Sequence, residues 1–229
     1  MKKLALGLMV MSLVFTGCTT NNETTEEAQT EQVETKEYDN TIEKKEVSVP
    51  GKETKIYEFY EKLVNEEQFV LKQGMHDPGM NLVQYNLMGR DGDRYINKMY
   101  QKSPTHEYEV RTIWTPESVI VINDTEELWE DMTDMRDQLT FADFSLILDR
   151  IEKATFATGD EEYENDTFYA ETFYEGEMGT TYLWKGDELK LILVNTAMGD
   201  ARMSIDRFEL TSDETLFELP SHYEENVEE

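Results

Sequence analysis

The chain has 229 residues, a formal net charge of −29 and a single cysteine, Cys18. So acidic a protein repels phosphate backbones, which argues against nucleic acid as a partner. One cysteine allows no disulfide within the chain and no multi-thiolate metal site.

The first segment has the three parts of an export signal. Met1-Lys2-Lys3 is positively charged, Leu4 to Phe15 is apolar, and Thr16-Gly17 places small residues before Cys18. The apolar run is too short to span a bilayer permanently. The stretch from Leu13 to Cys18 resembles the lipobox of bacterial lipoproteins, which implies cleavage before the cysteine and a diacylglycerol on its thiol. Two acyl chains anchor a protein stably, whereas one binds only marginally.

We therefore expect residues 1–17 to be a lipoprotein signal peptide and Cys18 to be the lipid attachment site. The protein would then lie at the cell membrane, lipid-anchored on its extracytoplasmic face. A plain secretory peptide and an uncleaved signal anchor stay open as alternatives. The leader Val10 to Gly17 also resembles the peptide pheromones that some Gram-positive bacteria release from lipoprotein signals.

Residues 18–50 are predicted to be the lipidated cysteine and a disordered acidic tether. This segment is rich in Thr, Glu, Gln and Asn, and Tyr38 is its only aromatic residue. It therefore buries too little apolar surface to offset the entropy of ordering. Its composition resembles the spacers of Gram-positive lipoproteins. Residues 51–229 have the length of one domain with a substantial core.

Two amphipathic helices are predicted in this domain. Ile56, Phe59, Tyr60, Leu63 and Val64 recur at the spacing of one helical face. A second helix is expected from about Thr140 to Lys153, with the same spacing in its apolar residues and with Thr140 and Asp143 as a capping pair.

Most of the remaining chain alternates with a period of two, which predicts strands. Turn signals join them into hairpins: Asp91-Gly92-Asp93, Thr115 to Ser118, Lys185-Gly186-Asp187 and Met198-Gly199-Asp200. The predicted strands are 82–90, 94–102, 107–114, 119–123, 167–174, 180–184, 188–195 and 201–210. In the last of these the apolar parity changes after Ile205, which predicts a bulge near Asp206.

Consecutive hairpins and only two helices favour an α+β fold with an antiparallel sheet over a doubly wound parallel fold. At this point the order of elements resembles the LolA/LolB superfamily, which includes LppX- and LprG-type lipoproteins. The residues that carry the likeness are Thr181 to Lys190, similar to that family's aromatic strand, turn and next strand, and Leu216-Phe217-Glu218-Leu219-Pro220 with Tyr223, similar to its closing segment.

The resemblance implies a half-open β-barrel, residues 51–229, whose curved antiparallel sheet has helices covering its concave side. It also implies a protein that binds and transfers acyl chains or another hydrophobic ligand, acting as carrier or chaperone without chemistry. One departure from the family is that this chain is itself predicted to be acylated and tethered. An interaction or sensor module that binds a protein partner and regulates a membrane complex stays open as the alternative.

Methionine and aromatic side chains suit an adaptable apolar binding surface. The candidates for the hydrophobic lining are Tyr85, Leu87, Met88, Tyr95, Met99, Tyr108, Val110, Trp114, Trp129, Tyr182, Trp184, Leu191 and Met203. Each is also compatible with an ordinary place in the core.

No motif for enzymatic chemistry was found. The histidines His76, His106 and His222 lack metal-ligand spacing, and the Asp91-Gly92-Asp93 segment lacks the later residues of a calcium loop. The chain has no nucleophile elbow, phosphate loop or zinc-protease helix. We therefore expect no enzyme, no metal and no cofactor. A glycosidase built on two carboxylates stays open, because their separation is a structural quantity.

Overall fold

The structure is a computed structural model that describes residues 47–226 except 78–81, 140, 176–177 and 197–198. The predicted signal peptide, Cys18 and most of the predicted tether therefore lie outside the described residues. Within the described part, no helix has the length and apolar character needed to cross a membrane.

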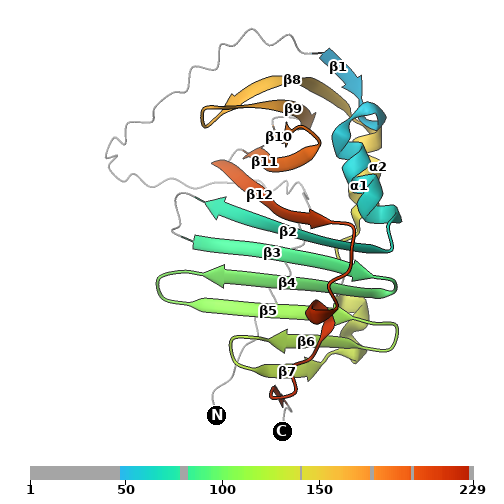
Figure 1. Cartoon of the computed structure of the whole chain (residues 1–229), viewed down its shortest axis with the longest axis vertical. Coiled ribbons are helices and arrows are strands. Elements are labelled where there is room, and N and C mark those ends of the chain that lie inside the picture. Colours follow the sequence, from blue (N-terminus) through green and yellow to red (C-terminus); the bar gives the residue numbers. More distant parts are fainter. Residues whose placement is uncertain (1–46, 78–81, 140, 176–177, 197–198, 227–229) are drawn as a thin grey trace, which may run out of the picture. The chain divides into compact units, whose positions relative to one another are not determined.

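The strands form a single curved and unclosed sheet (Figure 1). Its order is β1-β8-β9-β10-β11-β12-β2-β3-β4-β5-β6-β7-β13, and every pairing is antiparallel except β13 with β7. The strands are β1 (Val47–Pro50), β2 (Gln68–Asp77), β3 (Leu82–Asp91), β4 (Arg94–Lys102), β5 (Glu107–Trp114), β6 (Val119–Asn123), β7 (Leu128–Asp131), β8 (Thr155–Tyr163), β9 (Asp166–Glu175), β10 (Met178–Lys185), β11 (Glu188–Thr196), β12 (Gly199–Glu209) and β13 (Glu224–Glu225).

The sheet consists of two meanders that meet in its middle. Strands β2 to β7 follow one another, as do β8 to β12, and the pairing of β12 with β2 joins the two series. The predicted bulge is confirmed there, because the β12–β2 register shifts between Ile205 and Arg207. The predicted hairpin turns at Gly92 and Gly186 are also confirmed, since both glycines have φ near +60°, at 59° and 61°.

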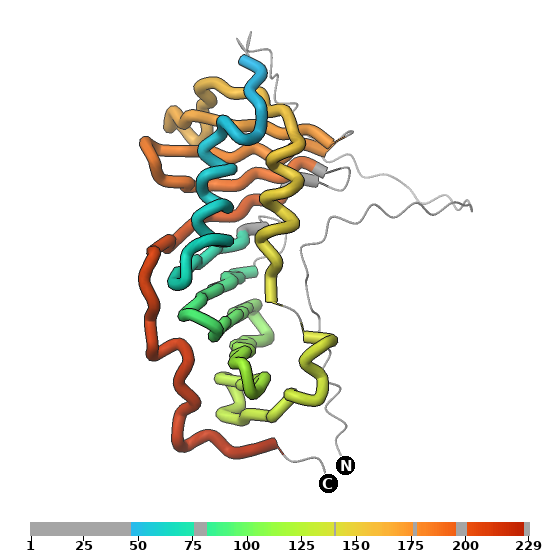
Figure 2. Tube along the Cα trace, turned by 90° about the vertical axis from the view of Figure 1, so that its right-hand side faces the viewer, coloured from blue at the N-terminus to red at the C-terminus, as the bar shows by residue number. Residues whose placement is uncertain are grey.

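Two helices, α1 (Lys55–Asn65) and α2 (Phe144–Lys153), lie side by side against the half of the sheet formed by β8–β12 and β2 (Figures 1 and 2). Three short 3₁₀ segments complete the elements of the described residues: η1 (Gly51–Glu53), η2 (Thr133–Gln138) and η3 (Glu214–Phe217). We call the face of the sheet under α1 and α2 the helix face. The other face is called the opposite face.

The first turn of α1 is held by side chains from two directions. Thr54 Oγ1 accepts from Tyr57 N at 3.2 Å, as an N-cap residue does. The carboxylate of Glu171 in β9, fully buried, accepts from Lys55 N at 2.7 Å and from Ile56 N at 2.9 Å. Three of the amides that a helix start leaves without partners are thereby satisfied.

Burial raises the pKa of Glu171, while the backbone N–H groups of Lys55 and Ile56 oppose that rise. A carboxyl that must be desolvated to reach its partners loses part of the hydrogen-bond energy to that desolvation. Glu171 therefore positions α1 on the sheet at an electrostatic cost.

Three predictions about element limits need correction. The second helix begins at Phe144 and not near Thr140, because Asp143 is its N-cap and accepts from Ser145 N at 2.9 Å; Thr140 itself lies outside the described residues. Residues 47–50, predicted to end the tether, form β1, because Val47 and Val49 alternate along the free edge of β8. The predicted Met198-Gly199-Asp200 turn falls partly outside the described residues, and Gly199 already begins β12.

Besides β1, four further strands were not predicted: β2, β7, β8 and the two-residue β13. In β2 and β8 polar residues interrupt the apolar alternation, and β7 has four residues. Their pairing with neighbours supplies the order that their own sequences do not indicate.

The largest hydrophobic core lies between the two helices and the helix face. Its buried members are Ile56, Phe59, Tyr60, Leu63, Phe69, Leu71, Met88, Phe144, Ile151, Phe156, Tyr182, Trp184, Leu189, Ile192, Val194 and Met203. Gly51 lets the chain approach α2 closely, since a Cβ there would lie 1.7 Å from the carbonyl oxygen of Ile151. This half of the sheet is thus filled by the chain's own side chains.

Candidate functional site

The helix face changes character beyond β3. Residues 132–139 and 141–144 pack on it at one end of β4, β5 and β6, where Phe141 contacts Tyr95 and Trp114 with ring centroids 4.9 Å and 5.8 Å apart. The helices α1 and α2 do not extend over β4–β7 (Figures 1 and 2). The middle of β3, β4 and β5 is therefore the part of the helix face to search for a ligand site.

Six half-buried side chains line this part of the helix face, and we call them the mid-sheet patch: Asn86, Asn97, Met99, Tyr108, Val110 and Thr112. Register places Met99 directly opposite both Asn86 and Val110, and places Asn97 opposite Thr112. Among the described residues, Met99, Tyr108 and Val110 belong to none of the hydrophobic clusters. Burial also raises the pKa of the Tyr108 hydroxyl.

Two buried acceptors of the patch lack partners. The side-chain oxygens Oδ1 of Asn86 and Asn97 are inaccessible to solvent and accept no hydrogen bond within the described part of the chain. An unmet buried acceptor costs about 1–3 kcal/mol. A buried polar atom without a partner requires an explanation, and one explanation is that a ligand supplies the donor. The patch thus combines apolar side chains with two buried oxygens that lack donors.

On the opposite face, the C-terminal part of the chain covers part of β4–β7. After β12, residues 210–226 run along β4–β7 on the side away from residues 132–139 (Figure 2). Leu216, Phe217 and Tyr223 pack on Ile96, Ile113 and Ile122 there, and β13 pairs with β7.

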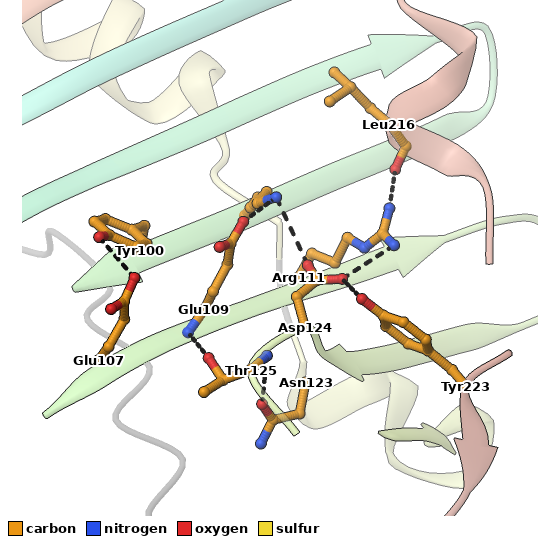
Figure 3. Close-up of polar contacts among 10 residues, drawn as sticks. Tyr100, Glu107, Glu109, Arg111, Asn123, Asp124, Thr125, Leu216 and Tyr223 are labelled. Atoms are coloured by element: carbon orange, nitrogen blue, oxygen red, sulfur yellow. Dashed lines mark hydrogen bonds and ion pairs between the residues drawn. The ribbon is translucent and has the colours of Figure 1, made fainter. Parts of the chain in front are cut away.

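A polar cluster ties this C-terminal segment to the sheet (Figure 3). Arg111 Nη1 donates to the carbonyl oxygen of Leu216 at 3.2 Å, and Arg111 Nη2 lies 3.1 Å from Asp124 Oδ1. Tyr223 donates its hydroxyl to the same oxygen of Asp124 at 3.2 Å. Lys98 bridges Glu109 and Asp124, with Nζ 3.7 Å from Asp124 Oδ2. These opposite charges compensate one another, so the cluster acts as a fastening.

The thirteen residues predicted to form the hydrophobic lining are divided between the two faces. Nine lie on the helix face: Met88, Tyr95, Met99, Tyr108, Val110, Trp114, Tyr182, Trp184 and Met203. Four lie on the opposite face: Tyr85, Leu87, Trp129 and Leu191. One surface therefore does not hold all thirteen.

Of the nine on the helix face, only three belong to the mid-sheet patch. Met88, Tyr182, Trp184 and Met203 are packed into the core beneath the helices. Tyr95 and Trp114 contact Phe141. Met99, Tyr108 and Val110 remain in the patch.

Residue type alone missed Asn86, Asn97 and Thr112, which complete the patch. Strand alternation is the signal that finds them, because each lies two positions from an apolar residue of the same face: Met88, Met99 and Val110. In the described part of the chain, no group of three His, Cys, Asp or Glu side chains has metal-binding geometry.

No protein-family model matches the chain, and no curated protein matches it by sequence. A solved structure to which it is similar is described as the crystal structure of an uncharacterized conserved protein from Thermus thermophilus. The two chains share 7% sequence identity over 75% of this chain and 96% of the other, with a TM-score of 0.42. A likeness of this size carries no argument about fold or function.

Proposed function

We propose that the protein is a membrane-anchored extracytoplasmic lipoprotein that binds a hydrophobic ligand, a lipid or the acyl chains of a lipoprotein, as carrier or chaperone. The observation that carries the proposal is the mid-sheet patch. It places half-exposed apolar side chains beside two buried oxygens that lack donors.

The chemistry of the patch suits an amphipathic ligand. An apolar chain lying on Met99 and Val110 would bury surface worth about 25 cal/mol per Å². The flexible thioether of Met99 adapts to irregular shapes. A hydroxyl or amide N–H of the same ligand would donate to Asn86 or Asn97 and remove the cost of those unmet acceptors.

The fold is consistent with this use. In our proposal the sheet is a LolA-like half-barrel in which α1 and α2 form the cover of the filled half, while the mid-sheet patch lies at the uncovered half. The C-terminal segment, fastened by Arg111 and Tyr223, covers Ile96, Ile113 and Ile122 on the opposite face of β4–β6. A ligand would then reach these strands from the helix face.

The anchor is the second part of the proposal. Cys18 would carry the diacylglycerol, and the segment before β1 would tether the domain to the membrane. Metabolic labelling with a palmitate analogue should tag the wild-type chain and leave a Cys18→Ser chain untagged. Equal tagging of both chains would contradict the anchor.

The ligand is tested by native mass spectrometry of the chain purified from cells. Wild type should retain lipid, and Val110→Arg should lose most of it, because a charge in the patch must be desolvated by an apolar ligand. The matched control is Leu146→Arg on α2, a leucine that is already 66% exposed, and it should retain lipid. Wild type free of lipid but crosslinked in cells to a stoichiometric protein partner would favour the interaction module instead.

A further inference from the structure

A depression on the opposite face of the sheet has a charge arrangement that the lipid proposal does not use. It has a volume of about 280 Å³, and its lining includes Lys72, Gly74, Tyr85, Ser204 and Asp206. Alternation and register place Lys72, Gly74, Tyr85 and Ser204 on that face. It therefore lies on the other side of the sheet from the mid-sheet patch.

Gly74 shapes the depression. A Cβ on Gly74 would lie 2.5 Å from Ser204 Oγ and 3.2 Å from Asp206 Oδ2, so these two side chains lean over the space that the glycine leaves free. The β12 bulge between Ile205 and Arg207 adds Asp206 to this wall. Ser204 Oγ donates to Asp206 Oδ1 at 2.7 Å, which orients the carboxylate.

The other wall carries a positive charge. Lys72 Nζ lies 4.2 Å from the centroid of the Tyr85 ring, and that ring stacks on Tyr100 with centroids 4.8 Å apart and planes inclined by 17°. A cation over an aromatic face is held electrostatically. In the described part of the chain, neither Lys72 nor Asp206 forms an ion pair, whereas most other described Lys and Arg side chains do.

We propose that this depression binds a small zwitterion, a free amino acid or a short peptide. Its carboxylate would pair with Lys72, and its ammonium group would pair with Asp206. A simple anion would be repelled by Asp206 and a simple cation by Lys72, whereas a ligand with both charges satisfies both walls. The volume of about 280 Å³ lies just below the range of about 300–1,000 Å³ for ligand pockets, which limits the ligand to a small molecule.

Calorimetric titration of the full chain tests the site with three zwitterions, L-alanine, D-alanine and dialanine, and with propionate and ethylamine as single-charge analogues. At least one zwitterion should bind tenfold or more tightly than either analogue, about the effect of one charge-assisted hydrogen bond. Lys72→Met and Asp206→Asn should each weaken that binding at least tenfold, and Gly74→Ala should do so by filling the depression. Lys62→Met, an exposed lysine on α1, is the matched control and should bind like wild type.

Circular dichroism shows whether each variant is folded. Two folded variants among the three are enough to test the site. Three results would overturn the site: no saturable binding of any zwitterion, equal binding of a single-charge analogue, or unchanged binding in folded Lys72→Met and Asp206→Asn. The last would mean that neither charge contributes to binding. Because the depression and the mid-sheet patch lie on opposite faces, Val110→Arg should leave zwitterion binding intact, so the failure of one proposal is distinguishable from the failure of the other.

Discussion

The two halves of the sheet use the same face in different ways. Over β8–β12 and β2, the helix face is buried beneath α1 and α2, and aromatic side chains such as Phe69, Phe156 and Trp184 fill the interval. Over β3–β5, the same face keeps Met99 and Val110 half-exposed beside two asparagine oxygens without donors. The first half is a packed core, and the second carries the surface that we propose as the ligand site.

The contrast shows how one continuous sheet can combine a packed core with a partly exposed apolar surface. Stability is concentrated where helices complete the core, since close packing there contributes most of the favourable free energy. The other half is stabilised from the opposite face by the C-terminal segment. The middle of the helix face on β3–β5, where Met99 and Val110 lie, takes no part in these clusters of the described residues.

The largest expected effect is a core truncation in the filled half. Phe69 is 1% exposed, and its ring meets that of Phe144 edge-on with centroids 5.9 Å apart. Phe69→Ala should therefore lower the unfolding free energy of the protein by about 3–5 kcal/mol. Val110→Ala in the mid-sheet patch should cost about 1 kcal/mol or less, because little packing is lost. Urea unfolding measures both, and equal costs would remove the distinction between the halves.

The fastening of the C-terminal segment comes next. Arg111→Met leaves Asp124 with Lys98 and Tyr223 as partners, so we expect a loss of about 2–3 kcal/mol, below the usual cost of isolating a buried charge. Tyr223→Phe removes a single hydrogen bond and should cost about 1 kcal/mol. Hydrogen exchange should show faster exchange in β6 and β7 for Arg111→Met, and unchanged protection of those strands would contradict the fastening.

The protonation of Glu171 makes the unfolding free energy depend on pH. Its folded pKa is raised above the ordinary value of 4.5, so the folded state holds this proton more tightly than the unfolded state. The stability it contributes is fully present below pH 4.5 and is lost as pH rises through the folded pKa. The unfolding free energy of wild type minus that of Glu171→Gln should therefore fall with rising pH and then level off, and a difference that grows with pH would show that the folded pKa is lowered instead.

The smallest expected effect sharpens the comparison most. Asn97→Leu removes a buried acceptor that has no partner, so the ligand-free chain should become more stable by about 0.5–1 kcal/mol. The same change should reduce lipid retention, because the ligand's donor loses its acceptor. A thermal melt and native mass spectrometry measure the two effects, and a destabilised chain would show that Asn97 serves the fold.

Local signals in the sequence predicted much of the fold. The spacing from Ile56 to Val64 identified α1, and Gly92 and Gly186 marked hairpins because their positive φ angles suit glycine. The parity change after Ile205 located the bulge in β12. These features depend on neighbours in the chain, which is why a single sequence contains them.

The features that were not predicted depend on contacts between residues distant in sequence. β2 and β8 gain their order from β12 and β9, and β1 from an edge that forms only when β8 is in place. The lining residues were chosen by type, so Tyr85 and Met88 were grouped although they lie on opposite faces. The docking of α1, α2 and the C-terminal segment decides which face of each strand is covered. No local sequence pattern predicts where these segments dock.

The most direct test of the ligand face is photocrosslinking in cells. Cells fed a photoactivatable fatty acid are irradiated, and the labelled peptides of the purified chain are mapped by mass spectrometry. The account predicts label on β4 and β5, in the segment from Asn97 to Thr112. Label confined to β9–β11, or a chain that carries no label beyond its anchor, would contradict it.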